Sequence, residues 1–249
     1  MWPDERVTKP MTAQAPERQP LATTPGASHP LVKICCIASV EEARLAVAAG
    51  AGALGLVSTM PSGPGVIDEA LIQEIAACVR QESPDVDTFL LTAHTHAQAI
   101  AEQHARLRTT TLQLVDHVPH DELKRLRGLC PGAKLVQVIH VQGEASVEEA
   151  QAAAPWVDAL LLDSGNPSLA IKELGGTGRT HDWATSRRIR DALHPLPVFL
   201  AGGLHADNVR AAMTSVQPRG LDLCSKVRTD GQLDATKLHA FMAAVRGHP

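Results

Sequence analysis

The stretch LVKICCI (residues 31–37) and its later counterpart LLLDSGN (residues 160–166) decide the fold. Each is an apolar run that reaches a titratable side chain, Cys35 in the first and Asp163 in the second. Strands that end in a polar residue followed by a loop are how a (β/α)8 barrel builds an active site at one end. A thiol and a carboxyl group that face each other across such a mouth are a candidate general base and general acid.

The rest of the chain repeats this pattern, with short β-like runs alternating with amphipathic stretches in which apolar residues recur at helical spacing. The strands are expected at residues 31–36, 51–57, 87–92, 110–115, 134–140, 157–162, 196–201 and 220–224. Eight such units in about 220 residues predict one α/β domain, a single (β/α)8 TIM barrel over residues 30–249. An open, doubly wound parallel sheet is the alternative.

The first 29 residues differ in composition from the barrel. Residues 1–29 are rich in Pro, Gln, Thr and Ala and contain almost no large apolar side chains. Such a segment cannot bury enough surface to offset the entropy of ordering it, so a disordered, mobile N-terminal tail is expected. The alternative is that the segment forms an arm packed on a neighbouring subunit. The protein is expected to be a monomer or a homodimer.

Charge and composition exclude several classes of partner. Lys and Arg number 23 against 27 Asp and Glu, a net charge of −4, and aromatic residues are 2 % of the 249 residues. Neither nucleic acid nor a membrane surface is therefore an expected partner. The five cysteines show no paired metal spacing, and we find neither a signal peptide nor a transmembrane run, which favours a reducing, cytoplasmic location.

Two glycine-rich loops predict a phosphate site. GGTGRTHDW (175–183) lies in the long connection after the Asp163 strand, and AGGLHADNV (201–209) leaves the seventh strand and enters a helix. Barrels bind phosphate near the loops after strands 7 and 8, where glycine lets backbone amides converge on one anion. The expected contacts are Gly175, Gly176, Gly178, Gly202, Gly203 and Ser225.

The thiol needs a positive neighbour to act as a base. Lys33 precedes Cys35 by two residues, so in a strand both side chains share one face, where the ammonium would favour a thiolate. Cys36 is expected to point to the opposite face and to matter little. A buried structural thiol at Cys35 and an ordinary turn residue at Asp163 remain the alternatives.

These motifs together resemble the phosphoribosylanthranilate isomerase family. The family's KICGI stands here as KICCI (33–37), LLLDS is unchanged (160–164), and the glycine loops correspond to GGTGKTFDW and AGGLNPENV. The resemblance runs from about residue 31 to residue 246. It implies that Asp163 is the general acid and Cys35 the general base of an Amadori rearrangement. An N-(5-phosphoribosyl) amine would become a 1-deoxyribulose phosphate, with no metal or organic cofactor.

The departures from the family pattern fall at the end of the site that holds the aromatic acid. MPSGPGVI places Gly65 where the family has an arginine for the anthranilate carboxylate, and QLVD keeps Gln113 but places Val115 where a histidine belongs. DLCSKVR keeps Asp222 and Ser225, against DVSSGVE in the family. The new residues there are Cys224, Lys226 and Arg228.

Three hypotheses about the function therefore stay open. They are phosphoribosylanthranilate isomerase itself, an isomerase or lyase acting on another phosphosugar, and a non-catalytic binder of phosphorylated ligands. The expected substrate-binding residues also include Lys33, Gln113, Asp222 and Lys226. Arg228 would approach from the phosphate side, and His140 is a replacement contact. Weak or absent activity on phosphoribosylanthranilate is expected, because Gly65 cannot hold a carboxylate. His94, His96 and His104 are interpreted as surface or capping histidines.

Overall fold

The computed structural model describes residues 29–166, 168–169, 172–175 and 178–247. The predicted tail, apart from its last residue, and the predicted phosphate contact Gly176 lie outside the described residues.

Eight parallel strands close into a barrel in chain order, and β1 completes the ring by pairing with β8 as well as β2. The predicted barrel is confirmed, and the open sheet is excluded. The strands are β1 Leu31–Ile34, β2 Ala53–Val57, β3 Asp87–Thr92, β4 Thr111–Leu114, β5 Lys134–His140, β6 Ala159–Asp163, β7 Val198–Leu200 and β8 Gly220–Leu223.

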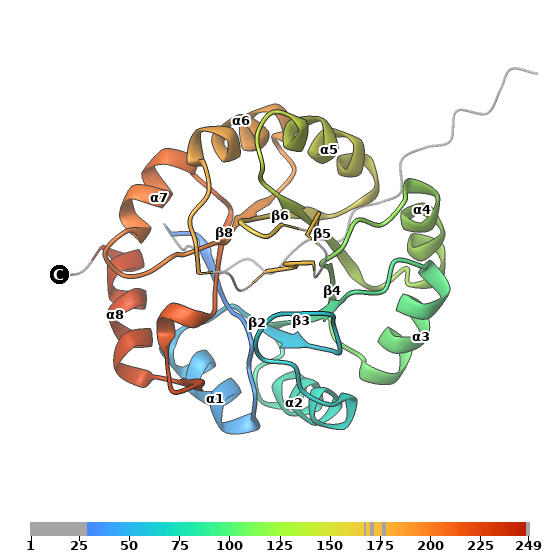
Figure 1. Ribbon diagram of the computed structural model, residues 1–249. Coiled ribbons are helices and arrows are strands. Elements are labelled where there is room, and N and C mark those ends of the chain that lie inside the picture. Colours follow the sequence, from blue (N-terminus) through green and yellow to red (C-terminus); the bar gives the residue numbers. More distant parts are fainter. Residues whose placement is uncertain (1–28, 167, 170–171, 176–177, 248–249) are drawn as a thin grey trace, which may run out of the picture.

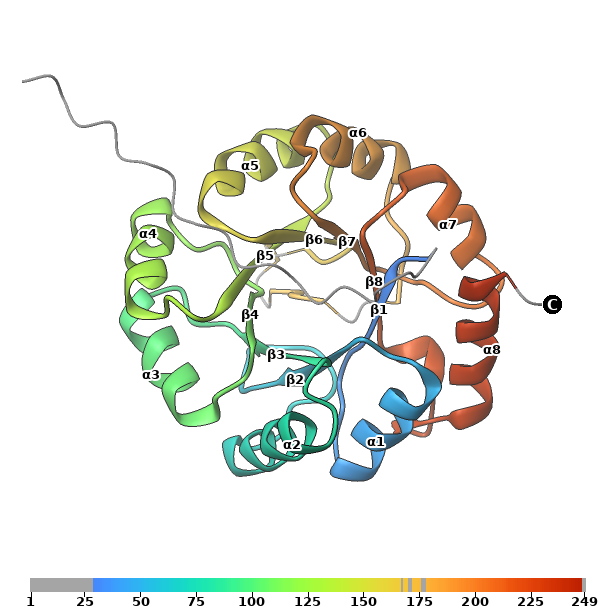
Figure 2. The same cartoon turned by 180° about the vertical axis from the view of Figure 1, so that it is seen from behind.

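A ring of helices surrounds the strands (Figure 1), and the view from behind shows the same ring (Figure 2). The helices are α1 Val40–Ala49, α2 Glu69–Glu82, α3 Ala97–Leu107, α4 His120–Leu129, α5 Ala145–Ala153, α6 Trp183–Leu193, α7 Val209–Val216 and α8 Ala235–Arg246. Side-chain caps begin α1, α2, α6 and α8, where Ser39, Asp68, Asp182 and Asp234 accept backbone N–H groups of the first turn. Within the described ranges, no helix is long and apolar enough to cross a membrane.

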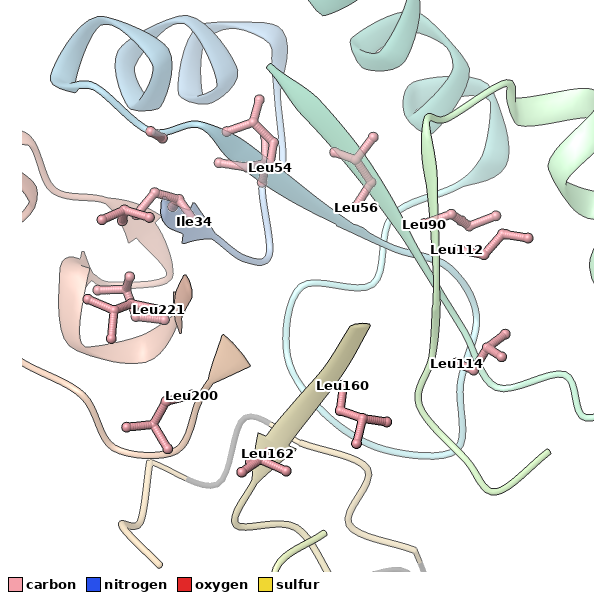
Figure 3. Packing of buried hydrophobic residues seen from close by; sticks show 14 of the residues in the cluster. Ile34, Leu54, Leu56, Leu90, Leu112, Leu114, Leu160, Leu162, Leu200 and Leu221 are labelled. Carbon is pink, nitrogen blue, oxygen red and sulfur yellow. The ribbon is translucent and has the colours of Figure 1, made fainter. Parts of the chain in front are cut away.

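Alternation along the strands separates two buried layers. Large aliphatic side chains such as Leu54, Leu56 and Leu162 point outward and fill the space between strands and helices (Figure 3). Their neighbours point inward, where Phe89 and Phe199 stack edge to face with ring centroids 5.9 Å apart. This two-residue period sends Lys33, Gln113 and Asp163 into the barrel, and so it positions the site.

Short elements that the sequence did not predict follow β8. A 3-10 turn, η2, spans Ser225–Val227, and the two short strands β9 (Arg228–Thr229) and β10 (Gln232–Leu233) then pair in antiparallel fashion. A second 3-10 turn, η1 (Ala154–Trp156), follows α5. The η2 turn matters for the site because it presents Ser225 and Lys226 to the mouth of the barrel.

Candidate active site

One open cleft lies at the carboxyl ends of the strands. It brings together most of the residues that the sequence singles out. Of the predicted site residues, it is lined by Cys35, Gln113, Asp163, Gly175, Gly178, Gly202, Gly203, Asp222, Ser225 and Lys226.

The floor of the cleft is an ion pair between β1 and β8. Lys33 Nζ donates to Asp222 Oδ1 at 2.8 Å, its side chain is fully buried, and the ammonium lies 5.3 Å from the centroid of the Phe89 ring. Burial alone would lower the pKa of Lys33, but the Asp222 carboxylate and the Cys35 thiol more than reverse this and raise it. The lysine is therefore a fixed positive charge beneath the site.

The thiol of Cys35 lies beside that charge. A methyl group built on Gly55 would come within 2.8 Å of Cys35 Sγ and 3.0 Å of Lys33 Nζ, so the sulfur and the ammonium are neighbours above β2. Cys35 N–H donates to Leu223 O at 2.9 Å, which extends the pairing of β1 with β8 past the last strand residue. The thiol has the positive surroundings that a thiolate base needs.

Asp163 ends β6 and is buried against a glycine. Its Oδ1 accepts the Ser164 N–H at 2.7 Å, and its Oδ2 would lie 2.9 Å from a methyl group placed on Gly175. Burial raises the pKa of Asp163, and the Ser164 N–H and the nearby His140 only partly oppose that effect. A carboxyl group that keeps its proton in a closed setting is suited to act as a general acid.

The expectation that Cys36 points away from the site is wrong. The β1 strand ends at Ile34, and Cys36 has a left-handed backbone with φ 61°, so the alternation that holds inside a strand no longer applies. Cys36 lines the cleft beside Cys35, and its Sγ lies 3.6 Å from Pro64 O. Hydrogen bonding to the Cys224 and Cys35 sulfurs, together with burial, raises the pKa of Cys36.

The two glycine-rich loops, after β6 and after β7, meet at the mouth of the barrel. Side chains on Gly202 and Gly203 would collide with the chain at Arg179 and Thr180, at 3.0 Å and 2.8–2.9 Å, and both glycines have positive φ. A methyl group on Gly178 would lie 3.5 Å from Ser225 Oγ. The loops after β6, β7 and β8 therefore converge on one spot, as a phosphate cradle requires.

Lys226 fits this cradle without backbone strain. It lies in the η2 turn, and its φ is not positive, so the position does not need glycine. Its side chain is exposed and forms no ion pair with another residue that the structure describes. The ammonium is available to a phosphate.

Arg228 does not approach the site as expected. Its guanidinium donates to Glu42 Oε1 at 2.9 Å and to the carbonyl oxygens of Cys35 and Cys36, the first at 3.2 Å. Its side chain is 9 % exposed, and the cleft is lined without it. Arg228 instead clamps the segment that follows β1, a role that its place in the sequence did not reveal.

Two histidines stay outside the cleft. His140 ends β5 beside Asp163 and bonds through Nε2 to Val115 O at 3.0 Å, while Nδ1 has no partner among the described residues. His181 packs near Gly202, and burial lowers its pKa to about 4. Within the described ranges, no group of three or more His, Cys, Asp or Glu side chains is arranged to hold a metal ion.

Gln113 and two apolar side chains, those of Met60 and Leu174, complete the lining of the cleft. Gln113 Oε1 is buried without a hydrogen-bond partner in the part of the chain that the structure describes, although the residue faces the cleft. A buried acceptor of this kind is normally satisfied, so it points to a ligand donor. Met60 and Leu174 also line the cleft; sequence patterns could not find them because both lie in irregular loops.

Comparison with known proteins identifies the family. The model of the N-(5'phosphoribosyl)anthranilate (PRA) isomerase family matches residues 32–244. The chain belongs to the phosphoribosylanthranilate isomerase family. Its relatives include the N-(5'-phosphoribosyl)anthranilate isomerase of Microcystis aeruginosa, which is 33 % identical over 208 residues, 83 % of this chain and 93 % of the relative. The isomerase of Halorubrum lacusprofundi is 35 % identical over 214 residues, covering 85 % and 94 %.

Solved structures of phosphoribosylanthranilate isomerases share the fold. The enzyme from Thermotoga maritima superposes with a TM-score of 0.74 at 25 % identity, covering 88 % of this chain and 99 % of that one. An isomerase in complex with reduced 1-(o-carboxyphenylamino)-1-deoxyribulose 5-phosphate superposes with a TM-score of 0.71 at 23 % identity. The family resemblance seen in the motifs is thus confirmed, and the roles of individual residues remain proposals.

Proposed function

We propose that the protein catalyses the Amadori rearrangement of an N-(5-phosphoribosyl) amine to the corresponding 1-amino-1-deoxyribulose 5-phosphate. The observation that carries this proposal is that Cys35 and Asp163 line one cleft together with the glycine cradle. A binding protein would not need a buried acid and a thiol beside a fixed ammonium.

In the proposed reaction, Asp163 protonates the ring oxygen of the ribose, which breaks the bond from that oxygen to C1 and leaves an iminium ion. Cys35, as thiolate, then removes the proton on C2, and the electrons neutralise the iminium to give an enolamine. Addition of a proton at C1 and loss of the proton on the C2 hydroxyl then convert the enolamine to the C2 ketone. The product is an isomer of the substrate, so the reaction consumes no other reagent.

The remaining lining residues hold the substrate. The cradle at Gly178, Gly202, Gly203 and Ser225, with the Lys226 ammonium, suits the 5-phosphate. The unpartnered Oε1 of Gln113 suits a substrate hydroxyl donor. The partner is therefore a phosphorylated sugar derivative. Whether the protein is a monomer or a homodimer, and its cytoplasmic location, stay predictions.

Reaction in D2O tests the mechanism directly. Substrates are formed from ribose 5-phosphate and an arylamine, and the product is followed by NMR. The ketose is expected to carry one deuterium at C1, because that carbon receives a solvent-derived proton. If no N-(5-phosphoribosyl) arylamine is converted faster than in the absence of protein, the proposal is wrong.

A further inference from the structure

The cleft has two chemically different ends. The end formed by the loops after β6, β7 and β8 carries the glycine cradle and Lys226. The end formed by β2, β3 and the loop after β2 is lined by the apolar side chains of Val57, Met60, Pro64 and Leu91, and Leu174 from the loop after β6 adds a further apolar side chain to the cleft. With the phosphate at the first end, the group bonded to the ribosyl nitrogen faces the second.

No cationic side chain lines the second end among the residues that the structure describes. Among the described lining residues, Lys226 is the only one with a cationic side chain, and it stands at the phosphate end. The neighbouring Lys172 forms an ion pair with Asp116. The strand-6 loop positions outside the described residues, 167, 170–171 and 176–177, have no ionisable side chain by sequence.

The polar groups at this end are also engaged. The hydroxyl of Ser62 donates to the carbonyl of Lys172, and the hydroxyl of Ser58 donates to Leu91 O at 2.7 Å. A carboxylate placed here would lose its water without gaining a charged partner, which is costly in an apolar setting.

The packing of the loop after β2 prevents one of its positions from supplying such a partner. Gly65 has φ 78°, and a side chain there would begin 2.4 Å from Cys36 Cβ and 2.9 Å from Cys36 Sγ. The thiol of Cys36 thus occupies the space that a residue at position 65 would need. The two loops interlock, and the wall stays neutral.

Building on the function proposed above, we infer that the substrate carries an uncharged, largely apolar group on the ribosyl nitrogen, such as an arylamine without a carboxylate. The specificity-determining residues are Gly65 and Cys36, which pack against each other at this end, and Met60, whose side chain lines the cleft.

Two substrates that differ only in one carboxylate test this inference. N-(5-phosphoribosyl)aniline and N-(5-phosphoribosyl)anthranilate are compared by kcat/KM with the same protein. We expect about a hundredfold preference for the aniline derivative, the scale of an unmatched charged contact. Equal efficiency, or a preference for the carboxylate, overturns the inference but leaves the proposed isomerase function standing. Failure of both substrates contradicts the proposed function instead.

Placing a cation in the wall tests the cause of the preference. Met60→Arg puts a guanidinium among the apolar lining, and Met60→Gln provides a polar side chain of similar length without charge. Met60→Arg is expected to shift the ratio of the two kcat/KM values at least tenfold toward the anthranilate derivative, and Met60→Gln much less. Thermal melting of both variants establishes that they are folded. A folded Met60→Arg variant with an unchanged ratio contradicts the inference.

Discussion

The acid and the base depend on opposite features of their surroundings. Asp163 is deeply buried, and burial raises its pKa, whereas Cys35 lies next to the Lys33 ammonium, the kind of positive neighbour that a thiolate base needs. Environments that separate two groups in this way assign one as acid and the other as base.

Removing either group is expected to slow turnover by about 10²–10⁴-fold, the usual contribution of general acid–base groups. Cys35→Ser and Asp163→Asn are the changes, and kcat with the preferred substrate is the measurement. Since burial raises the pKa of Asp163, the required protonated acid persists above the pH at which an exposed aspartate ionises. The alkaline fall in kcat that reflects this ionisation is expected to vanish in Asp163→Asn. A Cys35→Ser variant with wild-type kcat would remove Cys35 from the mechanism.

The site residues could be predicted from the sequence where a regular strand positions them. The two-residue alternation of β1 and β6 is visible in the sequence, so Lys33 and Asp163 could be assigned to the barrel interior. Cys36 could not, because it lies beyond the end of β1 with a left-handed backbone and packs against a loop about 30 residues away. Arg228 was misplaced for the same reason: its partners are Glu42 and two backbone carbonyls distant in sequence.

At the level of elements, strands and helices were more predictable than the loops between them. The strands Asp87–Thr92 and Lys134–His140 have the expected bounds, since each is rich in β-branched and large apolar residues and is followed by a polar loop. The hairpin of β9 and β10 was missed because strands of two residues leave no periodic signal. The loops carry much of the site, so the fold could be predicted more fully than the apolar wall.

The interlock between the loops after β1 and β2 predicts energetic coupling. Gly65→Ala is expected to destabilise the protein, because the new methyl group overlaps Cys36 and the backbone has positive φ. In a Cys36→Gly background the overlap with the side chain is gone, so the same change should cost less. A double-mutant cycle in urea should give a coupling of about 0.5–3 kcal/mol, the range for residues in contact. Additive effects would show that the loops do not interlock in solution.

The clamp formed by Arg228 joins the loop after β8 to α1 and to the segment after β1. Burial alone would raise the pKa of Glu42, but Arg228 and the N–H groups of Leu233 and Ala38 outweigh it and lower the pKa. A carboxyl group with a lowered folded-state pKa stabilises the fold above its unfolded pKa, and the contribution disappears as the pH falls through the folded value.

Arg228→Met is therefore expected to destabilise the protein at pH 7 by about 1–3 kcal/mol, less than a fully buried pair because Glu42 keeps some contact with water. The deficit should shrink toward pH 4, where protonation relieves the unpaired Glu42. Urea unfolding at both pH values measures this. Glu42→Gln combined with Arg228→Met is the control, and its deficit should not depend on pH in this way. A pH-independent deficit for Arg228→Met would contradict the role given to Glu42.

For the whole molecule, the phosphate cradle joins three loops of the closed ring, so an anion bound there should stabilise the barrel. Inorganic phosphate at about a hundred times its Kd would add about 2.7 kcal/mol to the free energy of unfolding and raise the Tm by about 5 °C or more.

Gly203→Ala should abolish this rise, since its methyl group would meet backbone atoms of Arg179 and Thr180 within 2.9 Å. Gly231→Ala is the matched control: Gly231 also has positive φ, 81°, but a methyl group there meets nothing within 4 Å. Both variants should lose intrinsic stability through backbone strain, but only Gly231→Ala should keep the full shift with phosphate. A full shift in Gly203→Ala would place the anion elsewhere, and the orientation of the substrate in the cleft would have to be reversed.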